Sequence, residues 1–255
     1  MKKLIPAICL LLVSAVMLGT STFAWFSMNT TVTATGMNIT AKSDSKFLQI
    51  INSAGSFDST AAQTSASAAT ATKEVKPTTV AKGLSAGALT AITSGDAATA
   101  IKFYETFSDS PSVATKGSEK SYTEVTATAT GADPANVYTL KNTFQVRLNP
   151  AAGASTGTNL TLSEVTIASD NDTPNDVMLA AVRVLVICGS NWAIWDVDGE
   201  VLTNCENILA ATVTTEATTI TVYVYFDGED ASTTTNNAAT LSTDGYDVEF
   251  ALTVS

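Results

Sequence analysis

The sequence predicts an all-β protein folded as a jelly-roll-like antiparallel β-sandwich, and three observations support this fold class. Short runs of Thr, Val, Ala and aromatic residues recur along the chain, separated by Gly, Asn, Asp and Ser, which is typical of strands joined by turns. Several runs alternate apolar and polar residues, whereas no long stretch has the period of a helix. A hydrophobic fraction of 45% over 255 residues excludes wholesale disorder and is enough for one large β domain.

Four segments in the second half of the chain carry the clearest strand patterns. Residues 136–148 place one apolar face on alternate positions, which predicts a half-buried strand. Residues 178–188 are apolar on both faces, which favours a central strand covered on both sides. Residues 219–226 alternate aliphatic and Tyr side chains, and residues 246–254 alternate so regularly that we expect this strand to pair within the domain.

The segment between these strands predicts a hairpin and a short helix. Residues 192–202 fit a hairpin that turns at Asp198-Gly199. Trp192 and Trp195 then lie on opposite faces of one strand and cannot form a single platform for a sugar. Residues 205–211 (CENILAA) are the helical candidate, with Asn204 as its N-cap.

Residues 52–100 differ in composition from the rest of the chain. They are rich in Ser, Thr, Ala and Gly and contain few large apolar residues. The segment is too long for an ordinary hairpin loop, so it predicts a loop-rich surface excursion. Weak strands are expected near Val75 and Val80.

The first 24 residues have the layout of a cleaved signal peptide. Lys2 and Lys3 precede an apolar run over residues 4–18, and the small residues Thr22 and Ala24 take the −3 and −1 positions of a peptidase site. Cleavage is therefore predicted between Ala24 and Trp25, which leaves a secreted protein without a stable membrane anchor. An uncleaved anchor is the alternative, although the run is shorter than the ~20 residues of a spanning helix.

Charge and composition exclude several classes of function. Removal of Lys2 and Lys3 would take the net charge from −11 to about −13, and such an acidic chain repels the phosphates of nucleic acid. The chain has no histidine, which excludes Ser-His and Cys-His nucleophile pairs and His-ligated metals. We expect no enzyme and no cofactor, with a carboxylate-dependent hydrolase as a distant alternative.

Two cysteines remain after the signal peptide, because Cys9 lies within it. In an oxidising compartment we expect Cys188 and Cys205 to form a disulfide. The alternative is a pair of buried free thiols, since Cys is among the most buried residue types.

Three acidic clusters suggest calcium but fit it poorly. Asp196, Asp198 and Glu200 begin like an EF-hand loop, but no Glu follows at its twelfth position. A hairpin turn explains this cluster better, so we expect no metal. The other clusters are residues 170–176 (Asp170, Asp172 and Asp176) and residues 227–230 (Asp227, Glu229 and Asp230).

A predicted strand follows the signal peptide directly. Val32 and Ala34 lie on one face, whereas Met37 and Ile39 continue in the opposite phase. The change of phase at Gly36 predicts a β-bulge, which glycine favours. Such an N-terminal strand can pair in its own sheet or with an open edge of a neighbour, and the second arrangement gives filaments.

Two stretches of sequence resemble one family. The N-terminal motifs "TFAWFS" and "TATGMNITA", together with "VYVYFDGED" at residues 222–230, are similar to the exported TasA and camelysin group, whose signal peptides are cleaved by a SipW-type peptidase. The resemblance implies a biofilm-matrix fibre subunit at the surface of a Gram-positive bacterium. Camelysins have been classed as metallopeptidases, but this chain lacks histidine and HExxH, so that activity does not carry over.

In fibre-forming members of that group, the N-terminal strand is donated to the next subunit. The resemblance therefore implies a signal peptide at residues 1–24, a donor strand at 25–42 and one sandwich domain at 43–255. The implied interface residues are Trp25, Phe26, Val32, Ala34, Met37 and Ile39. The expected function is a secreted structural subunit that polymerises head to tail, and the alternative is a monomeric secreted adhesin or carbohydrate-binding module.

Overall fold

The computed structural model describes twelve stretches of the chain. These are residues 32–43, 48–58, 63–67, 71–75, 77–80, 103–105, 123–125, 138–153, 155–169, 178–234, 237 and 246–255. The chain divides into two units, residues 1–30 and Thr31–Ser255. The predicted signal peptide, the Ala24–Trp25 cleavage point and Phe26 lie outside the described residues.

The described residues form strands and two short 3-10 helices. In chain order these are β1 (Val32–Ser43), β2 (Leu48–Asn52), β3 (Ser65–Ser67), β4 (Ala71–Val75), β5 (Thr78–Thr79), β6 (Phe103–Glu105), β7 (Thr123–Val125), β8 (Leu140–Leu148), η1 (Pro150–Ala152), β9 (Thr156–Ser169), η2 (Leu179–Ala181), β10 (Val182–Cys188), β11 (Asn191–Asp196), β12 (Gly199–Thr203), β13 (Ile208–Thr214), β14 (Thr218–Phe226) and β15 (Tyr246–Thr253). No helix among the described residues is long and apolar enough to cross a membrane.

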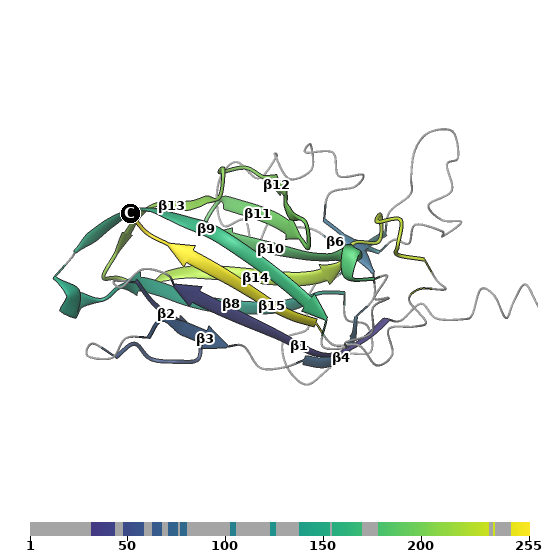
Figure 1. Ribbon diagram of the computed structural model, residues 1–255, viewed down its shortest axis with the longest axis horizontal. Helices are drawn as coiled ribbons and strands as arrows, with labels where there is room; N and C mark the ends of the chain where they lie inside the picture. The colour runs from purple at the N-terminus through teal and green to yellow at the C-terminus, as the bar shows by residue number, and fades with distance from the viewer. Residues whose placement is uncertain are drawn as a thin grey trace, which may run out of the picture. The chain divides into compact units, whose positions relative to one another are not determined.

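Two six-stranded sheets pack face to face, which confirms the predicted all-β sandwich (Figure 1). The first sheet has the order β13-β9-β15-β1-β3, with β4 also paired to β1, and the second has the order β12-β11-β10-β14-β8-β2. A small third sheet consists of β5-β6-β7. Nearly all pairs are antiparallel, but β1 and β15 are parallel.

The main core lies between the two large sheets. Aromatic rings join them: Phe144 of the second sheet meets Phe250 of the first at 5.4 Å, and Phe226 meets Tyr246 at 5.5 Å. Both contacts are edge-to-face, the geometry that aromatic pairs favour. The alternation predicted for residues 136–148 is confirmed, because its apolar side chains (Tyr138, Leu140, Phe144, Val146 and Leu148) are all buried.

A second hydrophobic cluster covers the outer face of the second sheet. Tyr223 and Tyr225 lie there beside β10 and β11, and Val80 of the long excursion and Phe103 of β6 pack on them. This cover explains why β10 is buried at every residue, as its two apolar faces predicted. The two tryptophans of β11 lie on opposite faces of the second sheet. Trp192 belongs to this outer cluster, whereas Trp195 packs against the main core.

The excursion is partly built into the fold. Strands near Val75 and Val80 were predicted, and β4 and β5 confirm them. Both valines are buried, and β4 pairs with β1. This part of the excursion is therefore a component of the sandwich.

The helix predicted at residues 205–211 is wrong. Glu206 and Asn207 have positive φ angles of 49° and 64°, so the chain turns there, and β13 begins at Ile208. Buried and exposed side chains alternate along this segment as in a strand, because Leu209 and Val213 are buried while Ala211 between them is exposed. Residues 179–181 are also a 3-10 turn, so the strand predicted from residue 178 starts at Val182.

The hairpin predicted at residues 192–202 is confirmed, but its turn residues are Val197 and Asp198, one position before the predicted Asp198-Gly199, because Gly199 already pairs as the first residue of β12. β11 and β12 pair with Asp196 opposite Gly199. The Oδ1 atom of Asp196 accepts hydrogen bonds from the backbone N–H groups of Asp198 and Gly199, at 2.8 and 3.1 Å. Gly199 has a φ of 134°, a conformation that favours glycine.

Candidate functional site

The N-terminal strand and its neighbours form the first candidate site. β1 lies in the first sheet beside β15, so the first and last strands of the fold are adjacent and parallel (Figure 1). Ile39 is opposite Val248 and Ala41 is opposite Phe250. In this chain β1 therefore pairs within its own sheet.

Gly36 divides β1 into two parts with different neighbours. The register of β1 with β4 shifts between Thr35 and Met37, which confirms the bulge predicted at Gly36. Residues 38–43 pair with β15 on one side, and residues 40–42 also pair with β3 on the other. Residues 32–37 pair with β4 alone among the described strands, so the first half of β1 is held along one edge.

Only part of the predicted interface can be located. Ile39 is 1% exposed and Ala41 is fully buried, and both belong to the main core. The side chains of Val32, Ala34 and Met37 lie outside what the structure describes, as do Trp25 and Phe26 entirely. The donation of these residues to a neighbour stays a prediction.

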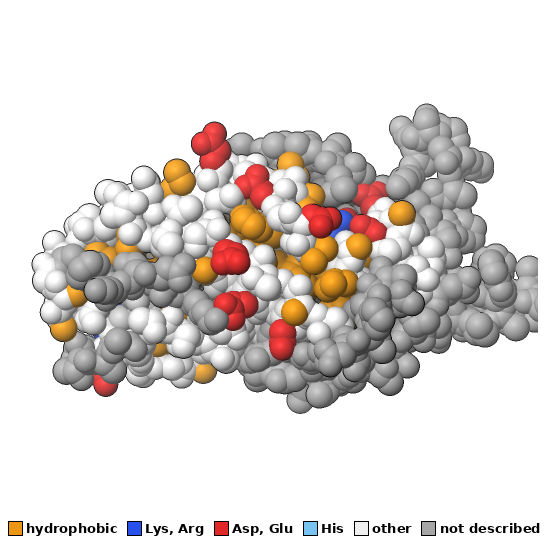
Figure 2. All heavy atoms as spheres, in the orientation of Figure 1, with side chains coloured by type: hydrophobic (Ala, Val, Ile, Leu, Met, Phe, Trp, Pro, Cys, Tyr) orange, Lys and Arg blue, Asp and Glu red, His pale blue; other side chains and the backbone are white. Residues whose placement is uncertain are grey.

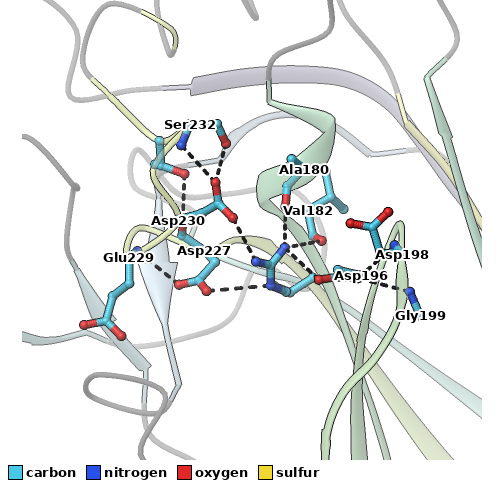
Figure 3. Close-up of polar contacts among 11 residues, drawn as sticks. Ala180, Val182, Asp196, Asp198, Gly199, Asp227, Glu229, Asp230 and Ser232 are labelled. Atoms are coloured by element: carbon cyan, nitrogen blue, oxygen red, sulfur yellow. Dashed lines mark hydrogen bonds and ion pairs between the residues drawn. The ribbon is translucent and has the colours of Figure 1, made fainter.

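The second candidate is a buried ion cluster around Arg183, near the start of β10 (Figure 3). Arg183 is 5% exposed. Its guanidinium lies 3.0 Å from an Asp230 carboxylate oxygen, 3.7 Å from Asp227 and 3.8 Å from Asp196. It also donates hydrogen bonds to the carbonyl oxygens of Ala180 and Val182.

The two acids of the turn after β14 occupy different environments. Asp230 is hydrogen-bonded by Arg183 and by the backbone and hydroxyl of Ser232. Partial burial would raise the pKa of Asp230, but these bonds outweigh burial and lower that pKa. Burial raises the pKa of Asp227, and the charge of Arg183 together with the hydrogen bond from the Glu229 backbone offsets this rise only in part.

The turn that contains Asp227 and Asp230 also contacts the excursion. Thr78 bridges to Asp227, and the backbone N–H of Gly228 donates to the Thr78 carbonyl at 2.9 Å. Since β4 ends three residues before Thr78, the turn held by Arg183 lies next to the strand that covers the first half of β1. A lone Arg in an apolar strand and an acidic turn were both visible in the sequence, but nothing in the sequence indicated that they meet.

The acidic clusters considered for calcium have other roles here. Asp227 and Asp230 face Arg183, while Asp196 closes the hairpin turn and Glu200 accepts a hydrogen bond from Asn207. In the part of the chain that the structure describes, no group of three His, Cys, Asp or Glu residues could hold a metal ion. The cluster at residues 170–176 lies outside that part. Figure 2 shows acidic side chains spread over one face of the described sandwich.

The expected disulfide is not formed in the structure, where Cys188 and Cys205 are free thiols. Cys188 is buried at the end of β10, and Cys205 is half-buried in the turn before β13. Burial and the charge of Cys205 raise the pKa of Cys188 to about 11. Their oxidation in the exported protein stays a prediction.

A pocket of about 460 Å³ opens at the edge of the sandwich. It is lined by the end of β10, the turn at Gly189–Ser190, Leu209 and Ala210 of β13, and the start of β14. None of its lining residues is charged. The sequence analysis did not predict this pocket, because it depends on how β13 and β14 diverge into different sheets.

Comparisons of this chain with protein-family models, with curated proteins and with solved structures found no match. The resemblance to the TasA and camelysin group therefore rests on the quoted motifs.

Proposed function

We propose that this protein is a secreted structural subunit that polymerises head to tail, through its N-terminal strand, into extracellular surface or biofilm fibres. The observation that carries the proposal is the position of β1. This first strand is buried in the sheet against the last strand, with Ile39 and Ala41 in the core. With the predicted cleavage after Ala24, residues 25–31 would precede β1 in the exported chain.

An N-terminal strand can be exchanged because it has a free end. Its withdrawal requires no loop to be threaded through the sandwich, and the same ladder bonds form with an identical strand from another copy. Four residues, 44–47, separate β1 from β2. A short connection of this kind favours exchange of an element between copies.

Two versions of the donation are compatible with this geometry. In the first, the whole of β1 moves to the neighbour, and Ile39 enters the partner's core. In the second, residues 38–43 stay between β15 and β3, and only the segment before the Gly36 bulge is donated. The second version keeps the doubly paired half of β1 in place and releases the half that β4 alone holds.

The N-terminal sequence supports export, and the quoted motifs support the fibre. A signal-like segment ends at Ala24, so Trp25 and Phe26 would open the mature chain and could anchor it to a partner, as large aromatics often do. A signal peptidase is the partner during export. We propose no catalytic activity and no cofactor, because the chain has no histidine and its buried acids Asp227 and Asp230 face Arg183.

One observation favours a second candidate, a monomeric secreted adhesin or carbohydrate-binding module. β1 pairs within its own sheet along residues 38–43, as a monomer requires. Trp195 is the half-buried aromatic residue of the hairpin, but its indole N–H is engaged by Asn207 at 3.2 Å.

Electron microscopy of the concentrated exported protein tests the proposal. The full form should make filaments, and a form that lacks Trp25–Ala41 should not. Main-chain pairing and the apolar side chains of the strand provide the affinity, so a synthetic peptide of Trp25–Lys42 should raise the melting temperature of the truncated form.

A second truncation, which removes residues 25–35, separates the two versions. It should remain monomeric and about as stable as the full form if only the segment before Gly36 is donated. Filaments from either truncated form would contradict the proposal. Absence of filaments from the full form at every concentration would favour the monomeric module.

A further inference from the structure

We propose that the pocket between β13 and β14 binds a neutral saccharide through the hydroxyl groups of Thr219, Thr221 and Ser190. One copy of the chain forms the described lining of this pocket. The site is therefore independent of polymerisation and would serve a fibre subunit and a monomeric module alike.

The walls of the pocket are held in place by the protein itself. One wall is the turn from β10 to β11 at Gly189–Ser190, and another is β13. The side-chain amide of Asn191 donates hydrogen bonds to the carbonyl oxygens of Ile208 and Leu209, both at 3.1 Å. Because this amide joins a strand of the second sheet to a strand of the first beside the pocket, the pocket is pre-formed, as ligand pockets usually are.

Thr221 provides the observation that points to a ligand. It is 6% exposed and lines the pocket, and in the described part of the chain its hydroxyl has no hydrogen-bond partner. That hydroxyl is not sealed from solvent, since the buried side-chain atoms without a partner among the described residues are Arg183 Nε and Trp192 Nε1. The Thr221 hydroxyl therefore opens into the pocket, where a ligand or water has to satisfy it.

Three more hydroxyl groups surround the same space. Thr218, Thr219 and Ser190 line the pocket, and within the described stretches none of these side chains makes a hydrogen bond. Each hydroxyl can donate one hydrogen bond and accept others. Such a set suits a ligand whose own groups both donate and accept, as the hydroxyl groups of a sugar do.

The other lining residues favour a neutral ring. Ile187, Leu209 and Ala210 are apolar and can cover the C–H face of a sugar. No residue of the lining is charged, so a carboxylate, phosphate or amine would lose water without gaining an ionic partner. A purely apolar ligand would leave the Thr221 hydroxyl unpaired. The volume of about 460 Å³ lies within the roughly 300–1,000 Å³ range of ligand pockets.

NMR titration of the full exported chain, at a concentration too low for filaments, tests the assignment. The ¹⁵N-labelled protein is titrated with glucose, galactose, mannose and N-acetylglucosamine, and with glucuronate and glucosamine as charged analogues. We expect at least one neutral sugar to shift the amide signals of residues 187–191, 209–210 and 218–221. The charged analogue of that sugar type should bind at least tenfold more weakly.

Dextran and mannan form a second arm, which separates a polysaccharide from a free sugar as the source of the ligand. Shifts at the same residues with either source support the site. Shifts confined to other residues, no shift with any neutral probe up to its solubility limit, or equal binding of glucuronate would each overturn it. Filament formation by the same preparation is scored separately by electron microscopy, so failure of the site is distinguishable from failure of the proposed function.

A matched pair of variants provides an independent test. Thr143 lies directly opposite Thr221 on β8 and outside the pocket lining. Thr221→Val keeps the shape of the side chain and removes only the hydroxyl, so the protein should stay folded. The Kd of the sugar that binds wild type should rise at least fivefold for Thr221→Val and stay within twofold for Thr143→Val.

Thr219→Val is a second variant at an exposed position of the lining, where folding is least affected. It should also raise the Kd, because it removes another hydroxyl from the mouth of the pocket. Unchanged affinity in the folded Thr221→Val and Thr219→Val proteins would overturn the inference.

Discussion

The guanidinium of Arg183 lies 3.0 Å from the carboxylate of Asp230 and 3.7 Å from that of Asp227, so one buried cation serves two acids of the same turn. Only the Asp230 contact is a hydrogen bond. The backbone of this turn also pairs with Thr78, through Asp227 and Gly228, and so holds the excursion against the core. The two acids should therefore differ in what they contribute to stability.

Asp230→Asn should lower the free energy of unfolding by about 1–3 kcal/mol, because it removes a charge-assisted bond from a buried guanidinium. Asp227→Asn should change it by less than about 1 kcal/mol, because relief of the burial penalty of Asp227 offsets the loss of a weaker contact. Urea unfolding of the two variants measures both values. A larger loss for Asp227→Asn would show that the 3.7 Å contact dominates.

The same acids should give opposite pH dependences. The lowered pKa of Asp230 means that its stabilising contribution is present above the unfolded pKa of about 3.9 and is lost as the pH falls through its folded value. The raised pKa of Asp227 means that its protonated form favours folding, and this advantage is lost as the pH rises through its folded value.

Unfolding curves between pH 7 and pH 3 check these signs. The difference in stability between wild type and Asp230→Asn should shrink as the pH falls below about 4. The difference between wild type and Asp227→Asn should instead move in favour of wild type on acidification. Parallel curves for both variants would contradict the assignment of environments.

The sequence predicted those features that alternation and turn chemistry determine locally. The two-sided burial of β10, the β11–β12 hairpin and the bulge at Gly36 all follow from residues within a few positions of one another, although the turn of the hairpin lies one residue before the predicted Asp198-Gly199. The structure also revealed what depends on distant segments. Cover of the outer face by Val80 and Phe103, the ion cluster at Arg183 and the pocket beside β14 each join segments far apart in sequence. At residues 205–211 a weak helix prediction gave way to strand pairing with β9.

Cys188 and Cys205 should be joined in the exported protein, since Cys188 belongs to the main core, Cys205 packs against that core, and the predicted destination is oxidising. Thiol labelling of the denatured, unreduced protein should then detect no free thiol from this pair, and two labelled cysteines would show that no bond forms. In the reduced native protein Cys205 should react first, because Cys188 is buried and has a pKa of about 11.

Ile39 tests whether the second half of β1 is a fixed part of the domain. Ile39→Ala should lower the free energy of unfolding of the monomer by about 2–5 kcal/mol, because it leaves a cavity at a core position that is 1% exposed. The neighbouring Thr40→Ala is the matched control on the opposite face of the strand and should cost about 0.5 kcal/mol or less. If residues 38–43 remain in their own sheet, the filaments of Ile39→Ala should form at the same concentration as wild type under conditions where the monomer is folded. If instead the monomer is unaffected and filaments dissociate more readily, Ile39 is seated in the neighbouring copy, and the whole of β1 is the donated strand.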